Sequence, residues 1–81
     1  MNLTKTIMSA IEGAAYVPRG AAQGLADYHK AQAVKAALRR RNPIERLCGV
    51  REALNQYRVS AWLTPESRIR LVLDGRVVAV L

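Results

Sequence analysis

The C-terminal quarter of the chain, Tyr57 to Leu81, contains the feature that most constrains the fold. Asp74-Gly75 separates two apolar runs, and Asp-Gly is favoured in two-residue hairpin turns because both central residues take a positive φ. Thr64-Pro65-Glu66-Ser67 marks a second turn, in which the proline supplies a fixed φ. Together the two turns predict three short antiparallel strands, over residues 57–63, 68–73 and 76–81.

The turns also predict which strand residues face the core, because side chains alternate between the two faces of a strand. If the loops are Pro65-Glu66 and Asp74-Gly75, Trp62 pairs with Ile69 and Leu71 pairs with Val78. The face expected to meet the core then contains Trp62, Ile69, Leu71, Leu73, Val78 and Val80.

The opposite face of this sheet mixes apolar side chains with arginines. One interpretation is a partly covered outer face, on which arginine stems lie over valines. The other is a binding or dimer surface, with Arg68 and Arg70 as a second candidate interface. We favour the first interpretation. The residues of this face are Val59, Ala61, Leu63, Arg68, Arg70, Val72, Val77 and Ala79.

The residues before the strands carry helical spacing, which predicts helices over residues 4–15, 21–40 and 43–55. In the first helix, Leu3, Ile7 and Ile11 recur at three- and four-residue intervals. The second helix is rich in alanine, the best helix former. Its apolar side is expected to contain Leu25, Tyr28, Ala31, Val34 and Leu38.

The third helix has the clearest start, since Asn42 suits an N-cap and Pro43 is tolerated at the first helical position. Gly49 costs about 1 kcal/mol relative to alanine and suggests a close approach to another backbone. Its buried stripe is expected to contain Ile44, Leu47, Cys48 and Leu54. Helices followed by strands predict a single α+β domain, with three N-terminal helices and a C-terminal three-stranded antiparallel β-meander.

An alternative interpretation treats residues 48–63 as a helix-turn-helix, in which residues 55–58 would face the major groove. Val59-Ser60-Ala61-Trp62-Leu63 followed by a hairpin resembles the small phage Cro-type repressors. The sequence departs from that family at Glu52, where the family has a buried aliphatic residue, and at Ala53, which replaces the usual turn glycine. Because residues 57–63 alternate well as a strand, we favour the strand and do not assign the family.

Catalytic chemistry has little to build on in this sequence. The chain has one histidine, one cysteine and no glycine-rich phosphate loop. We therefore expect no enzyme activity, metal ion, cofactor or small-molecule substrate. His29 is expected at the surface and Cys48 in the core. No stretch is long and apolar enough to span a membrane, and the single cysteine fits a reducing cytoplasm.

Positive charge is the most concentrated chemical signal, with 13 basic against 6 acidic residues and a net charge of +7. Such an excess favours polyanions. A helix dipole favours some basic residues at a helix C-terminus, but three consecutive arginines, Arg39 to Arg41, exceed that need. The candidate contacts to nucleic acid or to an acidic protein surface are Lys35, Arg39, Arg40, Arg41, Arg46, Arg51 and Arg58.

Two functions are consistent with these patterns. The first is a small basic nucleic-acid-binding protein, such as a regulator, which contacts phosphates through an arginine-rich corner. The alternative is a small phage- or plasmid-type inhibitor or adaptor that binds an acidic or nucleic-acid-handling protein. A homodimer formed through the outer sheet face or the last strand is compatible with both.

Overall fold

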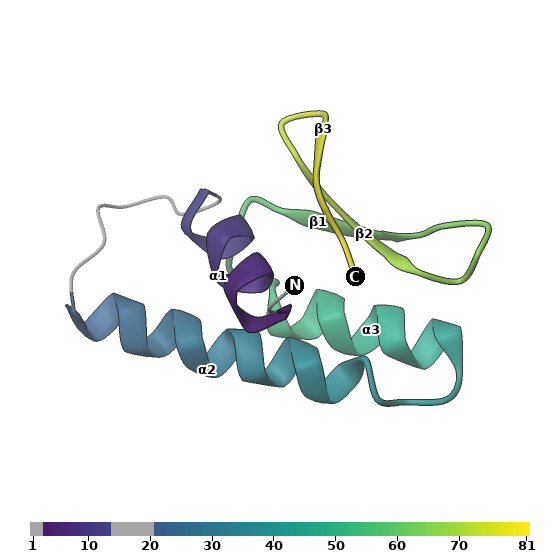
Figure 1. Cartoon of the computed structure of the whole chain (residues 1–81), viewed down its shortest axis with the longest axis horizontal. Helices are drawn as coiled ribbons and strands as arrows, with labels where there is room; N and C mark the ends of the chain where they lie inside the picture. The colour runs from purple at the N-terminus through teal and green to yellow at the C-terminus, as the bar shows by residue number, and fades with distance from the viewer. Residues whose placement is uncertain (1–2, 14–20) are drawn as a thin grey trace.

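The computed structural model describes residues 3–13 and 21–81 and has the predicted α+β arrangement (Figure 1). The strands form one antiparallel sheet in the order β1-β2-β3. The end predicted for the first helix, at residue 15, lies outside the described residues. The elements are α1 (Leu3–Gly13), α2 (Ala21–Ala37), α3 (Pro43–Ala53), β1 (Ser60–Leu63), β2 (Ile69–Leu73) and β3 (Arg76–Val80).

The hydrophobic core lies between the helices and one face of the sheet. Both α1 and α3 pack against α2, while α3 contacts β1 and α1 contacts β3. In Figure 1, α3 therefore lies between α2 and the sheet. The side chains at the centre are fully buried aliphatic residues from every layer: Ile7, Ile11, Val34, Val50, Ile69 and Leu71.

The start of α3 is as predicted, and the end of α2 is not. The Oδ1 atom of Asn42 accepts a hydrogen bond from the Ile44 amide at 2.8 Å, and Pro43 is the first helical residue. Helix α2 ends at Ala37 instead of residue 40, so Arg39 to Arg41 lie in the connection to α3. The carbonyls of Arg40 and Arg41 accept hydrogen bonds from the Arg46 side chain. This side chain replaces the backbone amides that would bind these carbonyls if the helix continued.

The buried side of α2 differs from the apolar side predicted. Leu25 and Tyr28 are exposed, whereas Asp27 is only 1% exposed, in line with Ala31 and Val34. The Tyr57 hydroxyl donates a hydrogen bond to Asp27 Oδ1 at 2.8 Å, which compensates for burial of the carboxylate. A hydropathy pattern cannot predict that the side of α2 containing Asp27 faces the core, because it treats aspartate as a surface residue.

The prediction of which residues of α3 are buried was also partly wrong. Leu47 and Leu54 are buried as predicted, but Ile44 is 58% exposed and Cys48 is an exposed free thiol. Gly49 is buried instead, on the side that meets α2. A Cβ built on Gly49 would lie 2.7 Å from the Ala37 Cβ and 3.2 Å from Arg40 Nη1. A close approach therefore exists at Gly49, but its nearest atoms belong to side chains and not, as predicted, to another backbone.

Substitution of Gly49 by alanine is expected to destabilise the protein, because Ala37 cannot move away without separating the two helices. Overpacking of this kind costs about 1–3 kcal/mol, which exceeds the helix-propensity gain of at most about 1 kcal/mol. The matched control is Gly24→Ala in α2, where a new Cβ would meet no atom of the described residues within 4 Å. Thermal melts should show a lower midpoint for Gly49→Ala and a higher one for Gly24→Ala; a higher midpoint for both would contradict the helix contact.

The first hairpin has a three-residue loop, one residue longer than predicted. Thr64 N donates to Arg68 O at 2.8 Å, and Ser67 has φ 64°. A turn followed by one left-handed residue is a common three-residue hairpin loop. The register therefore shifts by one, so that Trp62 pairs with Arg70 and Ala61 pairs with Leu71.

The second hairpin has the predicted Asp74-Gly75 turn, with φ values of 51° and 78°. Val72 pairs with Val77 as predicted, but Leu71 pairs with Ala79, which makes Val78 an extra residue in a β-bulge. A one-residue slip exchanges the two faces of a strand. The predicted core positions of Trp62, Val78 and Val80 are therefore wrong: these side chains are exposed, and Ala61 and Ala79 are buried with Ile69 and Leu71.

The helix-turn-helix alternative is not the structure of this chain. Helix α3 ends at Ala53, residues 54–58 form turns and bends, and residues 60–63 form β1. The residues proposed for a recognition helix are thus divided between a turn and an edge strand.

Candidate nucleic-acid interface

Four arginines meet where α2 turns into α3: Arg39, Arg40, Arg41 and Arg46, together called the basic corner. Arg46 Nη1 donates to the carbonyls of Arg40 at 2.8 Å and Arg41 at 2.9 Å. Its Nη2 donates to the Ser67 carbonyl at 3.4 Å, which links this corner to the β1–β2 turn. Arg46 therefore holds the backbone that presents the other three side chains.

Arg39 and Arg41 are the charges of the basic corner that make no contact with a polar partner among the described residues. Both are exposed, and neither side chain has a hydrogen-bond or ion-pair partner among the described residues. Arg40 lies over Gly49 and donates from Nη1 to the Glu45 carbonyl at 3.3 Å. Glu45 is the one acidic residue between positions 39 and 46, against four arginines, so the basic corner keeps a net positive charge.

The structure places the other predicted residues away from the basic corner. Lys35 Nζ donates to Thr4 Oγ1 at 2.9 Å and joins α2 to α1. Arg58 forms a salt bridge with Asp74 at 3.2 Å, beside the β2–β3 turn. Arg51 donates from Nε to the Ala61 carbonyl at 2.9 Å. Of the seven sequence candidates, the structure thus brings together Arg39, Arg40, Arg41 and Arg46.

Beside Arg51 is a hollow of about 400 Å³ at the edge of β1, called the β1-edge hollow. The Arg51 guanidinium lies 5.0 Å from the centre of the Trp62 ring, and Trp62 Nε1 donates to Ser60 Oγ at 3.0 Å. Trp62 is nevertheless 54% exposed. The residues that line the hollow are Arg51, Leu54, Asn55, Tyr57, Val59, Ser60, Ala61 and Trp62.

Sequence reasoning missed the β1-edge hollow because it assigned Trp62 to the core. The signal that could have found it is the length of the Thr64–Ser67 turn, since a three-residue loop places Trp62 on the outer face. Asn55 was considered as a contact residue only within the helix-turn-helix alternative.

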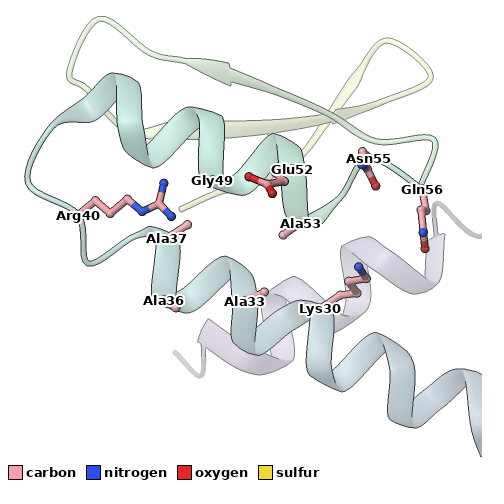
Figure 2. A pocket seen from close by; sticks show the side chains of 10 residues that line it. All are labelled: Lys30, Ala33, Ala36, Ala37, Arg40, Gly49, Glu52, Ala53, Asn55 and Gln56. Carbon is pink, nitrogen blue, oxygen red and sulfur yellow. The ribbon is translucent and has the colours of Figure 1, made fainter.

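A second hollow, of about 550 Å³, lies between α2 and α3 (Figure 2). Figure 2 shows Lys30 and Arg40 at opposite ends of a row of alanines on α2, with Glu52 reaching in from α3. The charges of this groove are mixed. It is consequently less suited to a polyanion than the basic corner is.

The second interface predicted from sequence, around Arg68 and Arg70, lies on the outer face of the sheet. Arg70 pairs across the strands with Trp62 and with Val80. Arg68 Nη2 donates to the Val80 carbonyl at 3.4 Å. Val77, Val78 and Val80 are exposed at the β3 side of this face.

Other kinds of site find little support in the part of the chain that the structure describes. No three His, Cys, Asp or Glu side chains there are grouped to hold a metal ion. His29 is exposed, as predicted. None of the described helices is long and apolar enough to cross a bilayer.

Comparison with protein-family models, curated proteins and solved structures gave no match. The functional argument therefore depends on the residues of this chain alone.

Proposed function

We propose that this protein is a non-enzymatic nucleic-acid-binding protein that contacts phosphates through the basic corner. The observation that supports this most directly is that Arg39 and Arg41 are exposed and have no partner among the described residues. Both lie on a turn whose backbone is bound by the Arg46 side chain. Phosphate contacts from arginine supply most of the affinity of non-specific nucleic-acid binding. A fixed backbone reduces the entropy lost when the side chains bind.

Arginine suits this role better than a general positive charge does. Its planar guanidinium can donate two parallel hydrogen bonds to one phosphate, which adds geometric selectivity to the charge. Arg40 and Arg46 use part of their donor capacity on backbone carbonyls, so they support the turn while they contribute charge. A cytoplasmic location, where nucleic acid is accessible and an exposed Cys48 stays reduced, is part of the proposal.

Binding of labelled single-stranded and duplex oligonucleotides over a series of salt concentrations tests the proposal. If four arginines contact phosphates, the logarithm of the affinity should fall against the logarithm of salt with a slope of about −2.8 for single strands. The corresponding slope for duplex DNA is about −3.6. Failure to bind either form at low salt would rule out the proposed function.

A protein-binding role remains the second candidate because of one observation. Val77, Val78 and Val80 form an exposed apolar group next to Arg68 and Arg70, as in surfaces that bind proteins. An inhibitor or adaptor would dock an acidic protein there, or this face would pair two copies. A protein that fails the oligonucleotide test should therefore be examined by sedimentation for self-association.

A further inference from the structure

We propose that the β1-edge hollow receives one unpaired nucleobase, so that this protein prefers single-stranded to duplex nucleic acid. This inference depends on the nucleic-acid binding proposed above and specifies the class of ligand. It uses residues outside the basic corner, which allows the two proposals to fail separately.

The shape and chemistry of the hollow suit a flat aromatic ring. Leu54, Val59 and Ala61 give it an apolar lining, while Trp62 and Arg51 contribute a planar indole and a planar guanidinium. Bases unstacked from a single strand bind by stacking on such groups. The hydrogen bond from Trp62 Nε1 to Ser60 orients the indole ring, and the residue as a whole is still more than half exposed. A volume of about 400 Å³ falls within the range of small-molecule sites, so there is room for a base with its sugar.

Polar groups at the hollow can recognise the edge of a base. Asn55 is exposed, and its amide has no hydrogen-bond partner among the described residues. An asparagine amide both donates and accepts hydrogen bonds, the combination that pairs with base edges. The Ala61 carbonyl is already bound by Arg51 Nε, which keeps that guanidinium beside Trp62.

The charges around the hollow favour an anion. Among the described residues, its lining contains Arg51 and no acidic residue, whereas Glu52 of the same helix lines the groove against α2. The basic corner lies at the N-terminal end of α3, and the hollow lies at its C-terminal end, beside Arg51 and Leu54. At 1.5 Å per residue, α3 is about 16 Å long, so a strand that contacts the corner and places a base in the hollow has to extend along this helix.

Two other occupants fit less well. A base within a duplex would have to leave its stack, at a cost of a few kcal/mol, before it could enter the hollow. A second copy of this chain, related by a two-fold axis through this surface, would bring like arginines together on proteins that each carry a net charge of +7.

The single tryptophan of the chain makes the test direct. Intrinsic fluorescence and the anisotropy of labelled oligothymidine and of a duplex of equal length are measured for the wild type, Trp62→Ala, Trp62→Phe and Asn55→Ala. Oligothymidine should quench the wild-type tryptophan. Trp62→Ala should weaken single-strand binding by about 5- to 150-fold, the equivalent of one stacked base, while duplex binding stays unchanged. Trp62→Phe should recover much of the loss, and Asn55→Ala should weaken single-strand binding only.

The matched control is Val80→Ala, which changes the same sheet face outside the hollow. Circular dichroism melts confirm that each variant is folded. Unquenched tryptophan, or a Trp62→Ala variant that binds both oligonucleotides as the wild type does, would overturn this inference and leave the basic corner intact. Binding of neither oligonucleotide by the wild type would overturn the proposed function itself. Quenching by polyglutamate in place of oligothymidine would assign the hollow to an acidic protein.

Discussion

Leu71→Ala is expected to lower the free energy of unfolding by about 2–5 kcal/mol, the usual cost of removing a buried leucine side chain. Leu71 lies in the central strand and is 0% exposed. Its cross-strand partners are Ala61 and Ala79, both too small to fill the cavity. In an 81-residue domain with a thin core, this is a large part of the total stability. Urea denaturation followed by circular dichroism measures the loss.

Trp62→Ala is the control for this experiment, because the sequence pattern placed Trp62 and Leu71 on the same core face. The structure exposes Trp62 on the opposite face, where its stacking with Arg51 is worth about 1 kcal/mol or less. If Trp62→Ala lowered the free energy of unfolding as much as Leu71→Ala does, Trp62 would lie in the core. That result would support a two-residue turn and contradict the pairing of Trp62 with Arg70.

The double variant Arg39→Glu/Arg41→Glu is expected to weaken nucleic-acid binding by about tenfold or more at low salt. It removes two phosphate contacts and places two carboxylates in the basic corner. The neutral variant Arg39→Gln/Arg41→Gln should make the salt slope for single strands shallower by about 1.4, since each contact contributes about 0.7. Because neither side chain has a partner among the described residues, the melting temperature should change little.

A matched comparison uses single charge reversals at two exposed arginines. Arg39→Glu lies in the basic corner, and Arg76→Glu lies at the start of β3, next to the Asp74-Gly75 turn. Both change the net charge equally, so a purely global charge effect would weaken binding to the same extent. If both variants lost the same affinity, the basic corner would be only a solvated helix end and not a phosphate-binding site. The position of the corner, just after the C-terminus of α2, is compatible with that outcome.

Half of the proposed binding surface could be found from the sequence. The run Arg39 to Arg41 before the Asn42-Pro43 helix start indicates a basic turn, since both signals act over a few neighbouring residues. The β1-edge hollow could not be found in this way. It requires Trp62 to face outward and Arg51 to reach the same strand edge, which involves elements ten residues apart that pack together only in the folded chain.

The order of helices and strands, the start of α3, the Asp74-Gly75 turn and the positive charge could all be predicted, because each depends on local chemistry. Which side chains face the core could not be predicted, because it depends on contacts between distant segments. Ser67 at a positive φ and the bulge at Val78 each shift a strand by one residue, which exchanges its faces. Likewise, the buried side of α2 includes Asp27, which accepts a hydrogen bond from Tyr57, thirty residues away. Interactions over such separations form only when the chain folds, so no local pattern contains them.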